Sequence, residues 1–351
     1  MKLLIVTDIL DVDDLSVGYF HRWIEEMALH ATSIHIITSK EGYHTLPPHV
    51  HVHSLGEEIK KGRIAKTLKY MWYLARYIRQ YDGVFVFGSP RAVVVAGWWW
   101  KLWKKKIGVW YAHGDPSLAL VFARPFLSYI FTPTTHGYHG GGDVKHIVGH
   151  GVDVNRFKPI LRPKHDGVFR MVTVGEIGHI KDYETMIRAV SLLKESVEKP
   201  FTLTIVGSPH EGEEKFANEV RSFAHSFGLS EVITFFGPMK NAEVAKLHQQ
   251  ADVYLSMNVL PALEKSLIEA SASSLPVITS NRSFEAFARD YSAFVFYEPK
   301  NDVELAERIR HMMLMSYDAR HALGHVFRNV AVHEHSIDVL ARSVVNAYEH
   351  P

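Results

Sequence analysis

A glycine-containing turn between a predicted strand and a predicted helix carries the first residues that could do chemistry. The strand covers residues 169–174, Gly175 opens the turn, and Lys181 stands where a helix begins near Asp182 or Tyr183. Free N–H groups and the dipole at a helix N-terminus favour a bound anion. Lys181 suits a diphosphate at that entrance, so we predict a phosphate-binding turn. The alternative is an ordinary strand-to-helix corner with a solvated lysine.

Glu269 is a second candidate, because its surroundings in the sequence are unusual for a carboxylate. It lies in the run Leu267-Ile268-Glu269-Ala270, within a helix predicted over residues 263–273. Apolar and small neighbours indicate burial, and a buried carboxylate needs a partner. Two carboxylate oxygens can accept hydrogen bonds from both hydroxyls of a vicinal diol. The alternative is a surface helix carboxylate.

The elements that must position these residues follow from the hydrophobic periodicity. Short β-branched runs alternate with longer amphipathic runs, which predicts parallel sheets flanked by helices. In the first half we predict strands at 3–7, 34–38, 51–54, 84–87, 107–111, 128–131 and 146–148, and helices at 17–29, 64–80 and 92–104. In the second half we predict strands at 169–174, 201–206, 232–236, 253–256, 277–279 and 293–296, and helices at 183–194, 213–227, 241–250, 263–273 and 302–315. Two such arrays predict two doubly wound α/β domains with ligand at the carboxyl ends of the strands.

The domain boundary is predicted where the pattern restarts. Residues 158–167 form a stretch rich in proline and charge, KPILRPKHDG, between the two arrays. A chain of 351 residues is suited to two domains. We therefore predict domains at 1–160 and 168–330, followed by an amphipathic helix at 336–351.

Composition narrows the class of protein. Hydrophobic residues make up 47% of the chain and charged residues 22%, as in soluble globular proteins. No run of about 18 uncharged apolar residues is present, so we predict no membrane-spanning helix. The chain has no cysteine, which excludes disulfides, thiolate zinc sites and cysteine nucleophiles. The N-terminus lacks the pattern of a signal peptide, so we predict a cytoplasmic protein.

A basic region at 60–106 predicts an anionic partner. It holds twelve Lys or Arg residues and one acidic residue, Asp82, while the net charge of the whole chain is only +1. Its end, GWWWKLWKKKIGVW (97–110), combines tryptophans with lysines, as surfaces that bind anionic lipid do. We predict a peripheral contact with the inner membrane face. The alternatives are tryptophans packed inside with solvated lysines, or a nucleic-acid surface, for which no motif is present.

Two clusters contain residue types that can bind metals, but neither has a metal-site pattern. The first is a glycine-rich stretch with four histidines: His136, His139, His146 and His150. The second is a loop with four carboxylates: Asp8, Asp11, Asp13 and Asp14. The histidines lack an accompanying carboxylate, and the loop lacks the calcium spacing. We therefore predict no metal, and interpret the acidic loop as an acceptor-binding loop or a helix N-cap.

Three separated segments carry a family resemblance. They are VGHGVDVNRFKP (148–159), TVGEIGHIKDYETMIRAVSLL (173–193) and PALEKSLIEASASSLPVIT (261–279). In order and spacing they resemble the C-terminal half of retaining, nucleotide-sugar-dependent glycosyltransferases of family 4, which have the GT-B fold. The resemblance implies transfer of a hexosyl group, with retention, from a nucleotide diphosphate sugar to an acceptor hydroxyl. An acceptor in cell-envelope glycan or glycolipid synthesis would fit.

The same resemblance implies which substrate each domain binds. The second domain would bind the nucleotide sugar and the first the acceptor. The helix at 336–351 would pack back on the first domain. No cofactor and no metal are expected besides the donor substrate.

Donor-binding roles are carried over position by position. Gly175 and Lys181 match the family's diphosphate turn, Glu269 matches the glutamate that accepts hydrogen bonds from the ribose hydroxyls, and Gly207 ends the next strand. One position departs from the pattern, because Glu176 stands where the family usually has Arg. A carboxylate there would repel the diphosphate.

Two residues are predicted to act at the transferred sugar. The family's first glutamate, eight positions before Glu269, is replaced by Pro261. Either Glu264 substitutes for it from the loop, or backbone N–H groups of 262–265 hold the phosphate and sugar. His113 follows a strand of the first domain, where family members often place a histidine. We predict that His113 binds donor or acceptor; the alternative is that it packs on the neighbouring aromatic run.

A second function remains open at this stage. Glu176 and Pro261 also fit a catalytically impaired GT-B protein that binds a nucleotide sugar or a protein partner. A GT-B phosphorylase would be larger and would need a lysine in a pyridoxal context, which the sequence does not contain.

Overall fold

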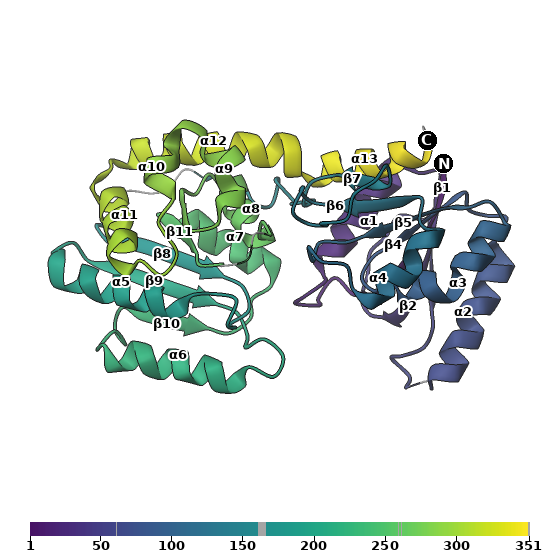
Figure 1. The fold of residues 1–351 in the computed structure, drawn as a ribbon, viewed down its shortest axis with the longest axis horizontal. Coiled ribbons are helices and arrows are strands. Elements are labelled where there is room, and N and C mark those ends of the chain that lie inside the picture. The colour runs from purple at the N-terminus through teal and green to yellow at the C-terminus, as the bar shows by residue number, and fades with distance from the viewer. Residues whose placement is uncertain (61, 161–165, 259, 261, 350–351) are drawn as a thin grey trace. The chain divides into compact units, whose positions relative to one another are not determined.

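The computed structural model describes residues 1–60, 62–160, 166–258, 260 and 262–349 (Figure 1). The chain divides into two compact units, one formed by Met1–Gly151 with Glu334–Pro351, the other by Val152–His333. This division falls before the junction predicted at 158–167, of which residues 161–165 lie outside the described part. Both units are α/β domains with parallel sheets, so the predicted fold class is confirmed.

The first unit is built on a seven-stranded sheet in the order β3-β2-β1-β4-β5-β6-β7, with every neighbouring pair parallel. The strands are β1 (Lys2–Leu10), β2 (Ser33–Glu41), β3 (Val50–Ser54), β4 (Gly83–Val86), β5 (Lys106–Trp110), β6 (Tyr129–Thr132) and β7 (Lys145–Ile147). The central strands are continuous runs of buried residues, as expected for strands covered on both faces.

Alternate residues of β1 enter two separate cores. Leu3 and Ile5 pack with α1 (Tyr19–His30) and α13 (Ile337–Glu349) on one face of the sheet. Leu4 and Val6 pack with α2 (Arg63–Tyr77), α3 (Arg91–Leu102) and α4 (Leu118–Ala123) on the other (Figure 1). The period of two along a strand therefore decides which helices each residue meets. A short 3₁₀ turn, η1 (Arg124–Phe126), follows α4.

The C-terminal helix α13 is held on the first unit by its last turns. The Tyr348 hydroxyl donates to the carbonyl of Val84 at 2.6 Å, and Lys106 Nζ donates to the carbonyl of Tyr348 at 3.0 Å. A Cβ atom at Gly83 would lie 2.5 Å from the Tyr348 ring, and one at Gly108 would lie 2.4 Å from its hydroxyl. Two glycines on adjacent strands thus make the space that the tyrosine fills.

The second unit is built on a five-stranded parallel sheet in the order β10-β9-β8-β11-β12. The strands are β8 (Phe169–Val174), β9 (Phe201–Val206), β10 (Ile233–Phe236), β11 (Val253–Ser256) and β12 (Val277–Thr279). The helices are α5 (Tyr183–Ser196), α6 (Glu214–Ser226), α7 (Asn241–Gln250), α8 (Lys265–Ala272), α9 (Glu285–Ala288), α10 (Ser292–Val295), α11 (Asp302–Leu314) and α12 (Tyr317–His335). Two 3₁₀ turns, η2 (Arg282–Phe284) and η3 (Arg289–Tyr291), flank α9.

Two features of the second unit differ from the sequence prediction. The strand predicted at 293–296 is wrong, because Ser292–Val295 forms the short helix α10 and only Phe296 makes an isolated bridge, to Thr279. A short apolar run does not distinguish a strand from a buried helical turn. The helix α12 was not predicted.

Among the described residues, no helix is both long enough and apolar enough to cross a bilayer.

Candidate functional site

The strand order of the second unit fixes where a ligand would bind. The chain passes from β8 outward to β9 and β10, then returns to β11 on the other side of β8. Ligands of doubly wound sheets bind outside the carboxyl ends of the strands at this switch point. Here the switch point lies between the loop after Val174 of β8 and the loop after Ser256 of β11. Predicted site residues lie on these two loops and on the loop after β9.

Two glycines allow the loops after β8 and β9 to approach closely. Gly175 has φ 141° and Gly207 has φ 150°, conformations that side chains rarely adopt. A Cβ atom at Gly207 would lie 2.0 Å from the carbonyl oxygen of Gly175, and one at Gly175 would lie 2.2 Å from Lys181 Nζ. The loops then pair through Ile177, whose N–H donates to the carbonyl of Ser208 at 2.8 Å. Both glycines therefore shape the backbone at the predicted position.

Lys181 and Glu264 meet at the switch point. Lys181 Nζ donates to the carbonyl of Val174 at 3.0 Å and lies 3.3 Å from Glu264 Oε1. The Ser256 hydroxyl donates to the other oxygen of Glu264. Lys181 is only 5% exposed, so it is not the solvated lysine of the alternative interpretation. The sequence predicts roles for these two residues separately. In the structure they lie together because β8 and β11 are neighbouring strands.

The N-terminus of α5 is not open to an anion, which corrects the prediction for that turn. The Asp182 carboxylate accepts from the Thr185 N–H at 3.2 Å and from the Thr185 hydroxyl at 2.7 Å. A negative cap occupies the position that we expected a phosphate to take. By contrast, α8 begins after Glu264 with no side-chain cap. The helix terminus suited to an anion near Lys181 is therefore that of α8.

Glu269 is buried and partnered, as the sequence required of a buried carboxylate. It is 5% exposed, and its Oε1 lies 3.4 Å from Lys265 Nζ and 3.3 Å from Asn241 Nδ2 of α7. Burial lowers the pKa of Lys265 to about 8, although the charge of Glu269 acts to raise it. A carboxylate with two donors already in place is oriented as a fixed hydrogen-bond acceptor.

Glu176 has a partner that the sequence analysis did not consider. Its carboxylate lies 2.6 Å from His210 Nδ1, on the loop after β9, and both side chains are exposed. The hydrogen bond and the charge of Glu176 raise the pKa of His210 above its ordinary value. A protonated His210 neutralises the carboxylate that we expected to repel a diphosphate.

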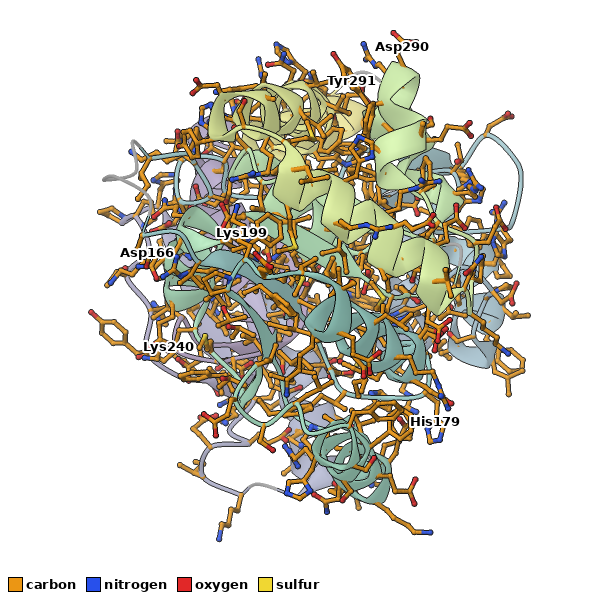
Figure 2. All side chains as sticks on the ribbon, turned by 90° about the vertical axis from the view of Figure 1, so that its left-hand side faces the viewer. Asp166, His179, Lys199, Lys240, Asp290 and Tyr291 are labelled. Atoms are coloured by element: carbon orange, nitrogen blue, oxygen red, sulfur yellow. The ribbon has the colours of Figure 1, made fainter. Side chains whose placement is uncertain are left out.

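The remainder of the β8 loop faces α6. His179, labelled at the surface in Figure 2, stacks on Phe216 with ring centroids 3.9 Å apart. Its Nδ1 lies 3.2 Å from Glu213 Oε2, and its backbone N–H donates to the same oxygen at 2.9 Å. A groove of about 610 Å³ between α5 and α6 begins at this loop and includes Lys181 in its lining.

Asn281, which follows β12, forms hydrogen bonds with two residues between β11 and α8. Asn281 Nδ2 donates to the carbonyls of Leu260 and Ala262, at 3.0 and 2.9 Å. Pro261, which replaces the family's first glutamate, lies outside the described residues. The position of Glu264 at the end of this loop is therefore anchored by an asparagine that sequence reasoning missed.

His113 belongs to the first unit, where it follows β5 at the carboxyl edge of the sheet. It is exposed, and its ring meets Tyr111 edge-on with centroids 5.3 Å apart. The carboxyl edge also contains Asp8 of β1, and burial raises the pKa of Asp8. β1 and β4 are the switch point of this sheet, and a Cβ atom at Gly88, just after β4, would lie 3.0 Å from Asp8 Oδ2.

The acidic loop does not cap α1, because the N-cap position is Gly18 and has no side-chain hydrogen bond, so the N-cap interpretation is wrong. Its carboxylates instead stabilise the turns before the helix. Asp14 Oδ1 accepts from the N–H groups of Ser16 and Val17, both at 2.9 Å, just before α1. Asp11 Oδ1 accepts from the N–H of Asp13 at 3.0 Å. These carboxylates organise the chain that enters the helix.

The four histidines of the glycine-rich stretch do not converge in the described part of the chain. His139 Nδ1 lies 3.0 Å from Asp115 Oδ1, and His146 packs edge-on against Tyr129. His150 Nδ1 lies 3.3 Å from His335 Nδ1 in a buried pair. Three of the four histidines thus contact different partners.

Several residues at the candidate site were not predicted. Lys265 could have been found, because a lysine four positions before Glu269 on a helix shares its face. The others come from different elements and carry no local signal in the sequence: Asn241, Ser256 and Asn281. Their proximity to the predicted residues is a product of the strand order.

Comparison with known proteins finds a family similarity within the second unit. Residues 157–329 match the family described as Glycosyl transferases group 1. Spore coat protein SA of Bacillus subtilis (strain 168) is 26% identical over 182 residues, which are 50% of this chain and 47% of that protein. The D-inositol 3-phosphate glycosyltransferase of Paenarthrobacter aurescens (strain TC1) is 28% identical over 157 residues, or 41% of this chain and 37% of that protein. The matches thus span less than half of these relatives.

A solved structure extends the likeness to the whole chain. Anabaena HepE in complex with UDP matches 100% of this chain and 100% of its own, with a TM-score of 0.76 and 14% identity. At this identity the likeness concerns the fold, and it confirms GT-B. The chain is thus similar to the group 1 glycosyltransferases over residues 157–329, and similar in fold to GT-B proteins over its whole length.

Proposed function

We propose that this protein is a retaining glycosyltransferase of family 4 that transfers a hexosyl group from a nucleotide diphosphate sugar to an acceptor hydroxyl. The observation that carries the proposal is the pair of lysine–glutamate contacts around the N-terminus of α8. Lys181 lies 3.3 Å from Glu264, and Lys265 lies 3.4 Å from Glu269. Two cations and two carboxylates at a switch point match a ligand with both a diphosphate and a diol.

The donor would lie along the first turn of α8. The diphosphate would contact Lys181 and the N–H groups at the start of α8, where the helix dipole favours negative charge. The ribose hydroxyls would donate to Glu269, which Lys265 and Asn241 already orient. Solved complexes of HepE contain UDP and UDP-glucose, which supports a donor of this class.

The reaction needs no protein base in this scheme. The bond between the anomeric carbon and the phosphate oxygen breaks, and the nucleoside diphosphate leaves with the electron pair. The acceptor oxygen forms the new bond on the same face, and its proton passes to the departing phosphate. Lys181 stabilises the negative charge that grows on this phosphate. Glu264 would accept hydrogen bonds from the hexose.

The acceptor would bind at the first unit. His113 and Asp8 both stand at the carboxyl edge of its sheet. The Asp8 carboxylate can accept a hydrogen bond from a sugar hydroxyl, and burial raises its pKa. A glycan or a lipid-linked glycan of the cell envelope fits such a polar edge.

A catalytically impaired nucleotide-sugar-binding protein is the second candidate. The observation that favours it is Glu176, a carboxylate beside the proposed diphosphate site. One experiment separates the two functions. The purified protein is titrated with UDP-, GDP- and ADP-sugars, and hydrolysis or transfer is followed for each donor that binds. Binding with turnover supports the enzyme, binding without turnover supports the impaired protein, and absence of binding refutes both.

We also propose that the first unit docks on anionic lipid through α2, α3 and α4. Large apolar side chains are exposed at helical spacing along these three helices: Ile64, Leu68 and Trp72 on α2; Val94, Val95, Trp98 and Leu102 on α3; Leu118, Val121 and Phe122 on α4. Single exposed apolar residues are ordinary, but a set this large on neighbouring helices marks an interaction surface. Exposed Lys101 and Lys104 flank it, which favours an anionic partner.

The tryptophan-rich helix α3 has both buried and exposed tryptophans. Trp100 is fully buried and its indole N–H donates to the Tyr81 hydroxyl at 3.0 Å, whereas Trp98 is 52% exposed. The nearby lysines also differ from one another: Lys101 and Lys104 are exposed, whereas Lys105 and Lys106 form hydrogen bonds within the unit. Lys105 donates to the Tyr81 carbonyl and Lys106 to that of Tyr348, so both support the fold.

The lipid test therefore changes exposed residues only. Trp98→Ser with Leu102→Ser, or Lys101→Glu with Lys104→Glu, should abolish sedimentation with anionic vesicles while nucleotide affinity stays unchanged. Each basic residue near an anionic surface contributes about 1 kcal/mol, and salt screens this attraction. Failure of the wild-type protein to sediment at low salt would refute the docking surface and leave a soluble acceptor.

A further inference from the structure

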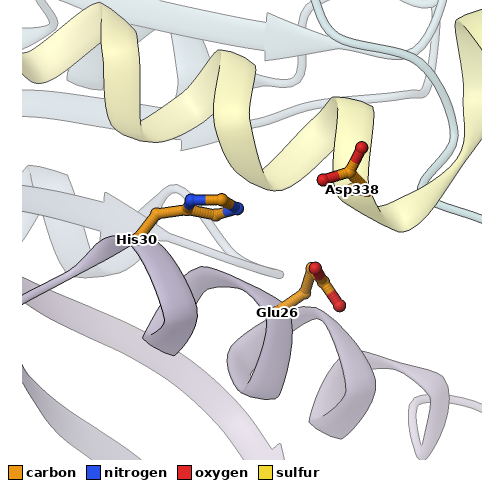
Figure 3. Close-up of side chains that lie close together, drawn as sticks. All are labelled: Glu26, His30 and Asp338. Atoms are coloured by element: carbon orange, nitrogen blue, oxygen red, sulfur yellow. The ribbon is translucent and has the colours of Figure 1, made fainter.

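We propose that Glu26, His30 and Asp338 form a binding site for one divalent transition-metal ion, zinc in the first place, that clips α13 to α1. One ligand-type atom from each residue lies within 4.8 Å of the other two (Figure 3). The site lies wholly within the first unit, because α1 and α13 both belong to it.

The position of the residues on their helices makes the grouping possible. Glu26 and His30 are four positions apart, so they share one face of the last turns of α1. Asp338 is in the first turn of α13, on the segment that returns to this unit from the far end of the sequence. Figure 3 shows the three side chains directed into the space between the two helices.

A second observation points to a ligand in that space. The Nε2 atom of His30 is buried and has no hydrogen-bond partner among the residues that the structure describes. A buried, unpaired ring nitrogen lowers stability unless something binds it. Figure 3 shows this end of the ring directed toward the two carboxylates. A metal ion would supply the missing partner for the nitrogen and would bind one oxygen of each acid.

The set of ligand atoms favours zinc over the alkaline-earth ions. Zinc accepts histidine nitrogen and carboxylate oxygen at about 2.0–2.2 Å, usually with four ligands in a tetrahedron. Imidazole selects against magnesium and calcium, which prefer oxygen alone. Ligand atoms around zinc are about 3.3–3.5 Å apart by this geometry. Small side-chain rotations close the present spacing, and water completes the shell.

The charges around the site agree with a bound cation. Glu26 and His30 stand at the C-terminal end of α1, where the helix dipole favours positive charge. Arg342 contacts Oδ2 of Asp338 from the next turn of α13, so we assign Oδ1 to the metal. The two carboxylates would balance a divalent ion.

The location implies a structural role. His30 ends α1 three residues before β2 begins at Ser33, so it lies near the amino edge of the sheet. Asp8 and His113, our candidates for acceptor binding, stand at the carboxyl edge. The ion would reinforce the packing of Leu340 and Val344 of α13 in the core shared with α1. It would act on stability and leave donor binding unchanged.

Zinc titration of the chelator-treated full chain tests the proposal. We expect one tight equivalent of zinc per chain, a rise in the unfolding temperature on zinc addition, and loss of both with His30→Ala or with Asp338→Asn. Glu25→Gln is the matched control, because this neighbouring carboxylate pairs with Arg22 and lies outside the triad. It should keep wild-type zinc affinity, while either triad variant should weaken zinc at least about tenfold.

Cobalt absorption of the wild-type chain is a second test, which does not depend on whether a variant folds. Cobalt added to the wild-type chain should give visible absorption that saturates at one equivalent and disappears when zinc displaces it. Absence of this signal, or equal zinc binding by wild type and the His30→Ala variant, overturns the site. Nucleoside diphosphate affinity, measured alongside with and without zinc, should not change, which separates this outcome from failure of the proposed transferase.

Discussion

Replacing Glu269 distinguishes a ligand-binding carboxylate from one that only balances a buried lysine. In the structure its Oε1 faces both Lys265 Nζ, at 3.4 Å, and Asn241 Nδ2, at 3.3 Å. Glu269→Ala would remove the charge partner of Lys265, and the pKa of Lys265 would fall below its present value of about 8. The change therefore perturbs both stability and, if our assignment is right, nucleotide binding.

The two effects are of similar size but act on different measured quantities. Breaking a buried ion pair on one side costs about 3–5 kcal/mol of unfolding free energy. The Lys265 side chain keeps 24% of its surface exposed, so water compensates in part and we expect about 2–3 kcal/mol here. Loss of a charged acceptor for the ribose hydroxyls should weaken nucleoside diphosphate binding by about 1.5–3 kcal/mol. That loss corresponds to a factor of about 10–150 in Kd.

A double variant separates these contributions. Lys265→Met should remove the buried charge, so Glu269→Ala combined with it should recover most of the lost stability. Binding should not recover, because the ribose still lacks its acceptor. Urea unfolding measures the first effect, and calorimetry with UDP, GDP and ADP the second. Glu184→Ala, an exposed helix carboxylate, is the control and should change neither.

One result would refute the reasoning. If the double variant binds the diphosphate as well as Lys265→Met alone, Glu269 contributes nothing to the ligand. Its burial would then serve only to pair with Lys265, and the nucleotide would have to lie elsewhere.

Two further predictions concern the diphosphate. Lys181→Ala should weaken binding of the nucleoside diphosphate far more than that of the nucleoside, since only the former carries the charge that Lys181 meets; equal losses in calorimetry would contradict this. Glu176→Arg should tighten diphosphate binding or raise turnover, and no gain would mean that Glu176 does not face the phosphate. The Glu176–His210 pair should also give a pH dependence. The raised pKa of His210 means that its contribution is fully present below about pH 6.5 and is lost as the pH rises through the raised value. Diphosphate affinity should fall over that interval, and His210→Ala should remove this dependence.

The sequence by itself determined the class of the fold and most of its elements. Buried runs such as 169–174 and 253–256 predict parallel strands, because only strands covered on both faces are apolar throughout. Local pattern also identified Glu269 as buried, since its neighbours Ile268, Ala270 and Ala272 are apolar or small. Where a run was short and apolar, as at 293–296, the pattern was equally suited to the helix α10, and the prediction failed.

The tertiary structure alone decided which side chains meet. Lys181 and Glu264 are 83 positions apart, and they touch because β8 and β11 are neighbours in the sheet. Asp182 caps α5, whereas α8 has no side-chain cap, so the helix N-terminus suited to an anion is that of α8. Glu26 and Asp338 come from opposite ends of the chain, and no sequence spacing connects them. Periodicity reports only whether a residue is buried; the strand order and the packing of helices decide its partner, and the chemistry of a site depends on the partner.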